Sequence, residues 1–199
     1  MINKKIIKRL VQYGFTLMTL PIFIVYWACS KILEPDGTFQ SFSQVLSLLP
    51  GKIGVYLRAA FYHLACPNTS QDISIGFLTI FSHRDTTIEE GVYIGPQCNI
   101  GKCKIGSNTL LGSGVHILSG KNQHNFDDPD MPIQFQGGHF EKIEIGKDCW
   151  LGNGSIVMVE VKEQTVIAAG SVITKSFDVA VVCGGNPAKL IKGRHKPAL

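Results

Sequence analysis

The sequence has little net charge and no paired cysteine motif, and each absence narrows the range of functions. The 199 residues carry a net charge of +4. This excess is too small to indicate nucleic acid binding, but it would suit a polyanionic cofactor or an anionic membrane surface. The cysteines form no CxxC pair and have no histidine beside them at metal spacing, so neither a disulfide framework nor a metal centre is expected. We interpret them as reduced, small apolar side chains in a reducing compartment. They are Cys29, Cys66, Cys98, Cys103, Cys149 and Cys183.

Residues 1–33 differ from the rest of the chain and predict a membrane-associated helix. An apolar run extends from Leu10 to Cys29, and twenty helical residues span about 30 Å, enough for a bilayer core. The basic residues that precede the run are Lys4, Lys5, Lys8 and Arg9.

Three interpretations of this segment are open. A cleaved signal peptide needs small residues at its cleavage site, and the stretch Tyr26-Trp27-Ala28 is bulky. A simple transmembrane anchor would keep its basic end inside and export everything that follows. Pro21 lies within the run and breaks or kinks a helix, so a re-entrant or in-plane membrane helix is the third interpretation.

Residues 34–71 are expected to form a helical cap or linker. Apolar residues recur at mixed spacing from Ser41 to Ala65, and Pro50-Gly51 divides the stretch. Such a segment could lie on a membrane surface. Capping is the favoured interpretation, because a stack of repeats must cover its exposed end.

Residues 72–199 are repetitive, with an aliphatic anchor at about every sixth position and usually a glycine after it. This period describes one flat face of a triangular coil, the parallel β-helix, in which glycine serves the tight corners. Residues 119–142 interrupt the period, and a loop this long in a compact repeat is usually functional. A smaller irregularity lies at 160–165, where the expected Ile-Gly pair is missing. The anchors are Ile88, Ile94, Ile100, Ile105, Leu111, Ile117, Ile145, Leu151, Val157, Ile167 and Ile173.

Three stretches carry a more specific signal: IGKDCWLGNGSIVM from Ile145, AAGSVITK from Ala168, and GGNPAKLIKGR from Gly184. With them, residues 72–194 resemble the hexapeptide-repeat acyltransferases, which include maltose, galactoside and serine acetyltransferases and surface-polysaccharide O-acetyltransferases. The resemblance implies an all-β fold, a left-handed parallel β-helix with a protruding catalytic loop. It also implies acetyl-CoA as co-substrate, no metal, and a homotrimer whose sites lie between subunits.

A histidine in the long loop is the predicted catalytic base. The stretch Gln123-His124-Asn125-Phe126-Asp127 resembles the Thr-His-Pro-Leu-Asp loop of the maltose acetyltransferases, which carries their catalytic histidine. A sugar hydroxyl is a poor nucleophile at neutral pH, and a neutral imidazole can accept its proton as it attacks a thioester. The predicted base is therefore His124. His139 in the same loop is the alternative, and His116 is interpreted as structural.

The resemblance also assigns binding residues by position. Coenzyme A would lie along the groove between coils of two subunits, where its extended pantetheine arm can pair with exposed backbone. Backbone at Asn153 would supply the oxyanion donor. The predicted cofactor-binding residues are Trp150, Asn153, Ala169, Gly170, Thr174, Lys175, Lys189 and Lys192. The predicted substrate-binding residues are His83, Asp85 and Asp127.

The location follows from the co-substrate. Because acetyl-CoA is made in the cytosol, a catalytic domain that uses it must face the cytosol. This favours a monotopic or re-entrant anchor around Pro21, with the N-terminal basic residues on anionic headgroups at the cytoplasmic face of the bacterial inner membrane. A membrane address in turn suggests a membrane-linked acceptor. The predicted function is transfer of an acetyl group to a sugar hydroxyl of a surface glycan or of its lipid-linked precursor.

Other functions remain open at this stage. The acceptor could be a small soluble molecule (a free sugar, serine or an antibiotic) or the amino group of a sugar. Metal-dependent hydration, as in the γ-type carbonic anhydrases that share the β-helix, needs three histidines around zinc. His116, His124 and His139 lack the close pair of that pattern. A catalytically silent β-helix is the remaining alternative.

Overall fold

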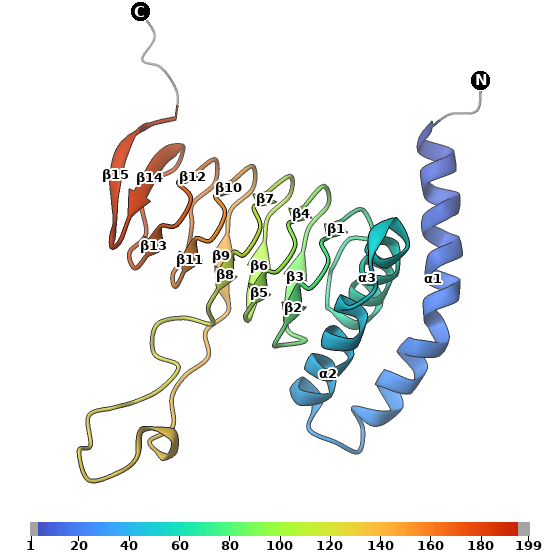
Figure 1. The fold of residues 1–199 in the computed structure, drawn as a ribbon, viewed down its shortest axis with the longest axis horizontal. Coiled ribbons are helices and arrows are strands. Elements are labelled where there is room, and N and C mark those ends of the chain that lie inside the picture. Colours follow the sequence, from blue (N-terminus) through green and yellow to red (C-terminus); the bar gives the residue numbers. More distant parts are fainter. Residues whose placement is uncertain (1–3, 195–199) are drawn as a thin grey trace, which may run out of the picture.

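The computed structural model describes residues 4–194, in which three helices precede a coil of short strands. Helices α1 (Lys4–Cys29), α2 (Pro35–Ser47) and α3 (Gly51–Ala65) lie at one end of the coil, and the strands wind away from them (Figure 1). The predicted all-β class therefore describes the coil alone, and the chain as a whole combines helices with parallel sheets. Residues 4–65 lack the six-residue period, and their apolar side chains recur at helical spacing.

The coil consists of three sheets, which form the faces of a prism. Sheet A has the order β1-β4-β7-β10-β12-β14-β15, sheet B the order β2-β5-β8-β11-β13, and sheet C the order β3-β6-β9. Neighbouring strands are parallel, apart from the antiparallel pair β14 and β15. The strands are β1 (Ser74–Ile75), β2 (Ile80–Phe81), β3 (Thr87–Ile88), β4 (Tyr93–Ile94), β5 (Asn99–Ile100), β6 (Cys103–Ile105), β7 (Leu110–Leu111), β8 (His116–Ile117), β9 (Ile143–Ile145), β10 (Trp150–Leu151), β11 (Ile156–Val157), β12 (Val166–Ile167), β13 (Val172–Ile173), β14 (Val181–Gly185) and β15 (Ala188–Gly193).

The aliphatic anchors of the repeats stack in register inside the prism. In sheet A, Ile94, Leu111, Leu151 and Ile167 face one another across four neighbouring strands, and all four are fully buried. Strands β1 to β13 are each only two or three residues long, so hydrogen bonds from coil to coil and this continuous apolar ladder hold the structure together.

The irregular repeat at residues 160–165 keeps the path of the coil. Val161 occupies the anchor position, forms a parallel bridge with Ile145 and is buried. Gln164 follows with a φ of 60°, a backbone conformation that usually favours glycine. The missing Ile-Gly pair therefore removes a regular strand and leaves the stack of anchors continuous.

Helices α2 and α3 close the first turn of the coil. Arg58 of α3 is completely buried, and its guanidinium donates to the carbonyl oxygens of Ile75 (3.0 Å), Leu46 (3.0 Å) and Leu49 (2.7 Å). One cation thus ties the end of α2 to strand β1. Tyr62 adds an aromatic contact, its ring centroid lying 4.3 Å from that of Phe81 in β2.

Helix α1 packs along the outer side of this cap. Phe15 stacks on Tyr56 at 5.0 Å between centroids, and Tyr26 meets Phe39 and Phe61 at 6.2 and 5.4 Å. The helix runs through Pro21 without a break and bends in its C-terminal third (Figure 1). Residues 6–29 are long and apolar enough to cross a membrane, with a mean hydropathy of 1.4.

The cysteines are free thiols, and five of the six are buried. Cys103 is completely enclosed, and this burial raises the pKa of its thiol to about 12. A thiol held neutral in this way is a poor nucleophile and acts as an apolar filler.

Candidate functional site

Residues 119–142 form an arm that leaves the coil between β8 and β9 and projects away from it (Figure 1). The outgoing and returning segments of the arm are hydrogen-bonded to each other near its root. The backbone N–H of Glu141 donates to Ser119 O (2.9 Å), that of His139 to Asn122 O (2.8 Å), and that of Asn125 to Gly137 O (2.9 Å). The arm is thus an irregular hairpin with a defined path.

The tip of the arm is held by one glutamine. Gln136 donates from its side-chain amide to the carbonyl oxygens of Asp128 (2.8 Å) and Met131 (2.7 Å), and its Oε1 accepts from the backbone N–H of Asp128 (3.1 Å). Asn125 Nδ2 also donates to Gln136 O (3.1 Å). These bonds give the exposed tip a fixed shape without a hydrophobic core.

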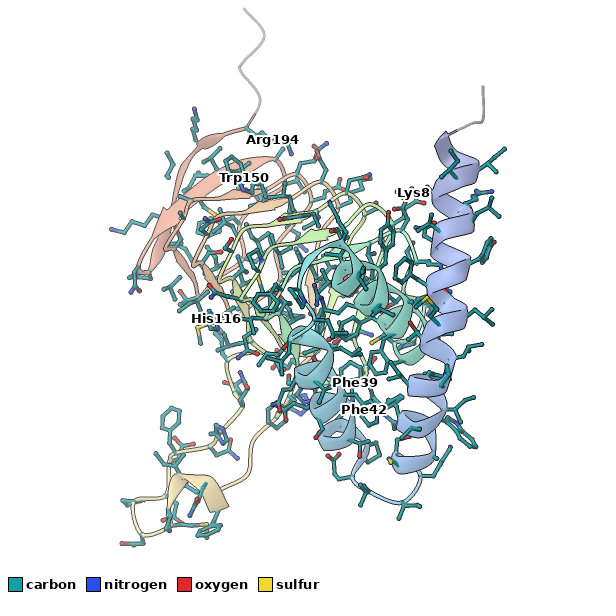
Figure 2. All side chains as sticks on the ribbon, turned by 45° about the vertical axis from the view of Figure 1, so that its right-hand side comes forward. Lys8, Phe39, Phe42, His116, Trp150 and Arg194 are labelled. Carbon is teal, nitrogen blue, oxygen red and sulfur yellow. The ribbon has the colours of Figure 1, made fainter. Side chains whose placement is uncertain are left out.

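His124 and His139 lie on the two facing strands of the arm, and both are exposed. The backbones approach closely beside His124: a Cβ added at Gly138 would lie 2.0 Å from Gln123 O and 2.8 Å from His124 N. His116 is instead an outward residue of β8, in register with Asn99 and Ile156. Figure 2 shows it on the coil near the point where the arm departs.

The arm is fixed to the coil at its root by charged and polar contacts. Lys142 Nζ lies 2.7 Å from Asp85 Oδ1 and 3.2 Å from Thr87 Oγ1, and Lys102 Nζ lies 3.3 Å from Asp85 Oδ2. The hydrogen bond from Lys142, aided by Lys102, holds the pKa of the Asp85 carboxyl below its usual value. On the other strand, Lys121 Nζ donates to Thr174 O (3.2 Å). Asp85, predicted to bind substrate, thus also holds the arm, a role that no pattern in the sequence indicates.

A surface hollow of about 250 Å³ lies between the root of the arm, α2 and the outer face of sheet B. His83 lines it and contacts Phe140, with 5.2 Å between ring centroids. Ser82 Oγ lies 2.8 Å from His83 Nδ1. Other residues of the lining are Gln40, Asn99, His116 and Gln123. His83 is thus placed beside polar groups at the base of the arm, whereas Asp127 is exposed farther out along it.

Three predicted cofactor-binding residues meet at one corner of the prism. Asn153 and the pair Ala169-Gly170 occupy equivalent turns of neighbouring coils, and Gly170 N donates to Asn153 O (2.8 Å). Asn153 Oδ1 accepts from Ser113 N (3.1 Å), and Gly170 has a φ of 69°. All three are exposed, so a ligand can reach the backbone at this corner.

The other predicted cofactor-binding residues are spread over the coil. Trp150 points outward from sheet A, is 54% exposed and lies in register with Leu110 and Val166 (Figure 2). Lys189 and Lys192 are exposed on β15, paired with Gly184 and Val182. Thr174 and Lys175 follow β13, and Lys175 Nζ lies 5.6 Å from the centroid of the Phe177 ring. Within residues 4–194, no group of three or more His, Cys, Asp or Glu side chains is arranged to hold a metal ion.

Two family models of hexapeptide repeats match the coil. Residues 85–119 match the model of the bacterial transferase hexapeptide (six repeats), and residues 142–175 match that of the hexapeptide repeat of succinyl-transferase. The coil thus contains two blocks of hexapeptide repeats. The two matches lie on either side of the arm, so the arm is an insertion between repeats.

Curated relatives that match part of the chain are acetyltransferases by name. A chloramphenicol acetyltransferase of Klebsiella aerogenes is 30% identical over 112 residues, which cover 48% of this chain and 53% of that protein. A putative colanic acid biosynthesis acetyltransferase of Escherichia coli K12 is 28% identical over 117 residues, covering 54% and 58%. The chain thus spans little more than half the length of these relatives.

A solved structure matches over a larger part of the chain. The crystal structure of a maltose O-acetyltransferase from Clostridium difficile 630 superposes with a TM-score of 0.70 at 20% identity, covering 82% of this chain and 90% of that one. This likeness establishes the fold. Together with the hexapeptide repeat, it implies that the coil is a left-handed β-helix.

Proposed function

We propose that this protein is an acetyl-CoA-dependent O-acetyltransferase that acts on a sugar hydroxyl and uses His124 as general base. One observation carries the proposal. The insertion between the two blocks of repeats is a braced arm, and it presents an exposed histidine outside the coil. A surface loop with its own internal bracing, carried by a rigid scaffold, is typical of a functional segment.

The chemistry requires a base close to the acceptor hydroxyl. The unprotonated ring nitrogen of His124 accepts the hydroxyl proton while the oxygen attacks the thioester carbon of acetyl-CoA. Backbone N–H groups at the Asn153 corner stabilise the resulting oxyanion. The C–S bond then breaks, the imidazolium returns its proton to the departing thiolate, and the ester and free CoA are formed. His139 on the facing strand is the alternative base.

The site is proposed to be completed by a second copy of the chain, in a homotrimer. Sheet A presents a row of exposed apolar side chains that are in register: Tyr93 (45% exposed), Leu110 (42%) and Trp150 (54%). The arm carries Phe126 and Phe135, which are 72% and 69% exposed. Apolar surfaces of this kind usually mark contacts between molecules. Packing of copies around an axis would bring the arm of one copy to the coil of the next.

Coenzyme A is proposed to bind along the coil edge. Exposed backbone at Asn153, Ala169 and Gly170 would pair with the pantetheine amides. Lysine side chains would meet the phosphates as point charges. The lysines proposed for that role are Lys175, Lys189 and Lys192; Thr174 would meet the phosphates through its hydroxyl, and Trp150 would line the site.

The acceptor is proposed to enter the hollow beside His83 and to belong to a surface glycan or its lipid-linked precursor. The hollow is lined by both polar and apolar side chains, lies at the base of the arm, and is bordered by α2 of the cap. Helix α1, on the far side of the cap, is apolar enough to associate with a membrane, which would place the protein at the cytoplasmic face of the inner membrane. Asp127 would contact the acceptor from the arm, and Asp85 from the coil.

A small soluble acceptor is the second candidate. It is favoured by the 30% identity with a chloramphenicol acetyltransferase. An amino group in place of the hydroxyl would use the same base and the same thioester.

The test is release of CoA from acetyl-CoA with lipid-linked sugars, free sugars and chloramphenicol as acceptors. We expect turnover with a sugar acceptor, a loss of about 10²–10⁴-fold in His124→Ala, and an unchanged increase of the melting temperature by CoA in that variant. His63→Ala, which removes an exposed histidine of α3 outside the hollow, is the matched control. Near-normal turnover in His124→Ala would exclude it as the base, and absence of CoA binding by the unmodified protein would reject the acyltransfer reaction altogether.

A further inference from the structure

One side of helix α1 is an unbroken apolar stripe that no other part of residues 4–194 covers. The stripe follows helical spacing along the whole helix, and its exposed fractions are high: 64% at Leu10, 70% at Leu17 and 59% at Ile24. Its other exposed members are Ile6, Ile7, Tyr13, Met18 and Val25. A surface this apolar is costly to leave in water and marks a site of interaction.

The opposite side of α1 is attached to the rest of the protein along its entire length. Near the start, Lys8 forms an ion pair with Asp72, and Gln12 Nε2 donates to Gln71 O (3.2 Å). Aromatic contacts continue the attachment through Phe15 and Tyr26. A transmembrane position of α1 would pull Asp72 and the polar start of the coil into hydrocarbon, at a large free-energy cost. The contacts are compatible with a helix that stays at the surface of a membrane.

The orientation of α1 relative to the coil also favours a position at the membrane surface. The strands of each sheet follow one another along the axis of the coil. Helix α1 lies crosswise to that axis at the base of the coil, with α2 and α3 between it and the strands (Figure 1). The exposed stripe therefore faces away from the coil. In any assembly of copies around an axis along the coil, the α1 helices would lie at one end and face outward together.

The charges on α1 favour an anionic lipid surface. The helix contains no acidic residue, and exposed Arg9 lies near its start. At the other end, Lys31 lies 5.5 Å from the centroid of the Trp27 ring, which is 53% exposed. Tryptophan and basic side chains at the border of an apolar stripe are typical of helices that lie in the membrane interface.

We propose that α1 docks the base of the coil on an anionic lipid bilayer, lying in the plane of the membrane with its stripe in the interface and the coil standing away from it. This orientation refines the membrane location given under the proposed function. It does not depend on the acyl-transfer chemistry, so an inactive His124→Ala variant binds lipid equally well.

Binding is tested with the full chain by co-sedimentation with phosphatidylcholine vesicles, with and without phosphatidylglycerol. We expect binding that is stronger with phosphatidylglycerol, and a loss of about tenfold or more when Leu10, Leu17 and Ile24 are changed together to glutamine. The matched control changes three equally exposed apolar residues at the other end of the coil to glutamine: Val179, Leu190 and Ile191. Absence of binding to both vesicles, or an equal loss in the control, would overturn the proposal.

The in-plane position is tested by the depth of single tryptophans. The chain has two tryptophans, so a Trp27→Phe, Trp150→Phe background allows one to be placed at position 10, 17 or 24. Quenching by lipids brominated at different depths should place all three at one shallow level. A spanning helix would instead spread positions 10 and 24 over about 20 Å, and that result would contradict the proposal even if the vesicles are bound.

Discussion

The coil and the arm of this protein are specified in different ways. In the coil, the inner strands of each sheet are held by neighbours on both sides, and buried anchors such as Ile94, Ile100 and Leu151 form continuous ladders. In the arm, Phe126 and Phe135 are exposed, and the shape rests on a few hydrogen bonds around Gln136 and the ion pairs of Asp85. The coil therefore carries the stability, and the arm is the segment to which we assign the proposed chemistry.

The largest expected effect is on the stability of the coil. Ile100→Ala should lower the free energy of unfolding by about 2–5 kcal/mol, because it opens a cavity in a completely enclosed ladder. Phe126→Ala removes a larger side chain from the tip of the arm and should change that free energy by less than about 0.5 kcal/mol. Urea denaturation followed by circular dichroism measures both. Equal losses in the two variants would mean that the arm is part of the folding core.

The second prediction concerns turnover, which the arm should control although it contributes little to the free energy of unfolding. Gln136→Ala removes the side chain that braces the tip, and kcat/KM should fall about tenfold because His124 is then less well positioned. The melting temperature should stay nearly unchanged. Gln134→Ala is the matched control, because Gln134 is an exposed glutamine of the same turn. A similar loss in both glutamine variants would argue against a specific role of the brace.

The smallest effect is expected at the root of the arm. Asp85→Asn breaks the ion pairs with Lys142 and Lys102. The carboxylate is half-exposed, so the loss of stability should be no more than about 1 kcal/mol. Since the folded-state pKa of Asp85 lies below its unfolded value, its contribution is present above about pH 4 and is lost as the pH falls through the lowered pKa.

Unfolding of Asp85→Asn and of the unmodified protein at pH 7, 5 and 3 checks this dependence. The difference between them should be constant from pH 7 to 5 and smaller at pH 3. A difference that grows at low pH would mean that the ion pairs do not stabilise the root.

The repeated part of the fold was predictable because its signal is periodic. An aliphatic residue every six positions must face inward, and its burial follows directly, as for Leu111 and Ile167. Even the irregular repeat has a buried anchor, Val161, although a lysine and not a glycine follows it in the sequence. The helices were less predictable, because Pro21 can either break or kink a helix, and only the structure shows that α1 continues through it.

The internal structure of the arm and its root could not be predicted from the sequence. The bonds of Gln136 are made to backbone atoms, and the pairing of Asp85 with Lys142 joins residues 57 positions apart. Neither leaves a pattern in composition or spacing. The same holds for the hollow that brings His83 next to Phe140, because it forms only where the coil, the arm and α2 meet.

We propose that the arm of one copy completes the site on the coil of another, and mixed oligomers of two inactive variants can reveal this arrangement. His124→Ala removes the base on the arm, and Ala169→Trp obstructs the exposed corner of the coil; each variant alone should be inactive. Co-assembled, the intact arm of the second variant can meet the intact corner of the first. Because the site is proposed to be shared between copies, mixed oligomers are expected to regain a substantial part of the turnover. Verified mixed oligomers without any recovery would contradict it, since the base and the corner would then have to come from one chain.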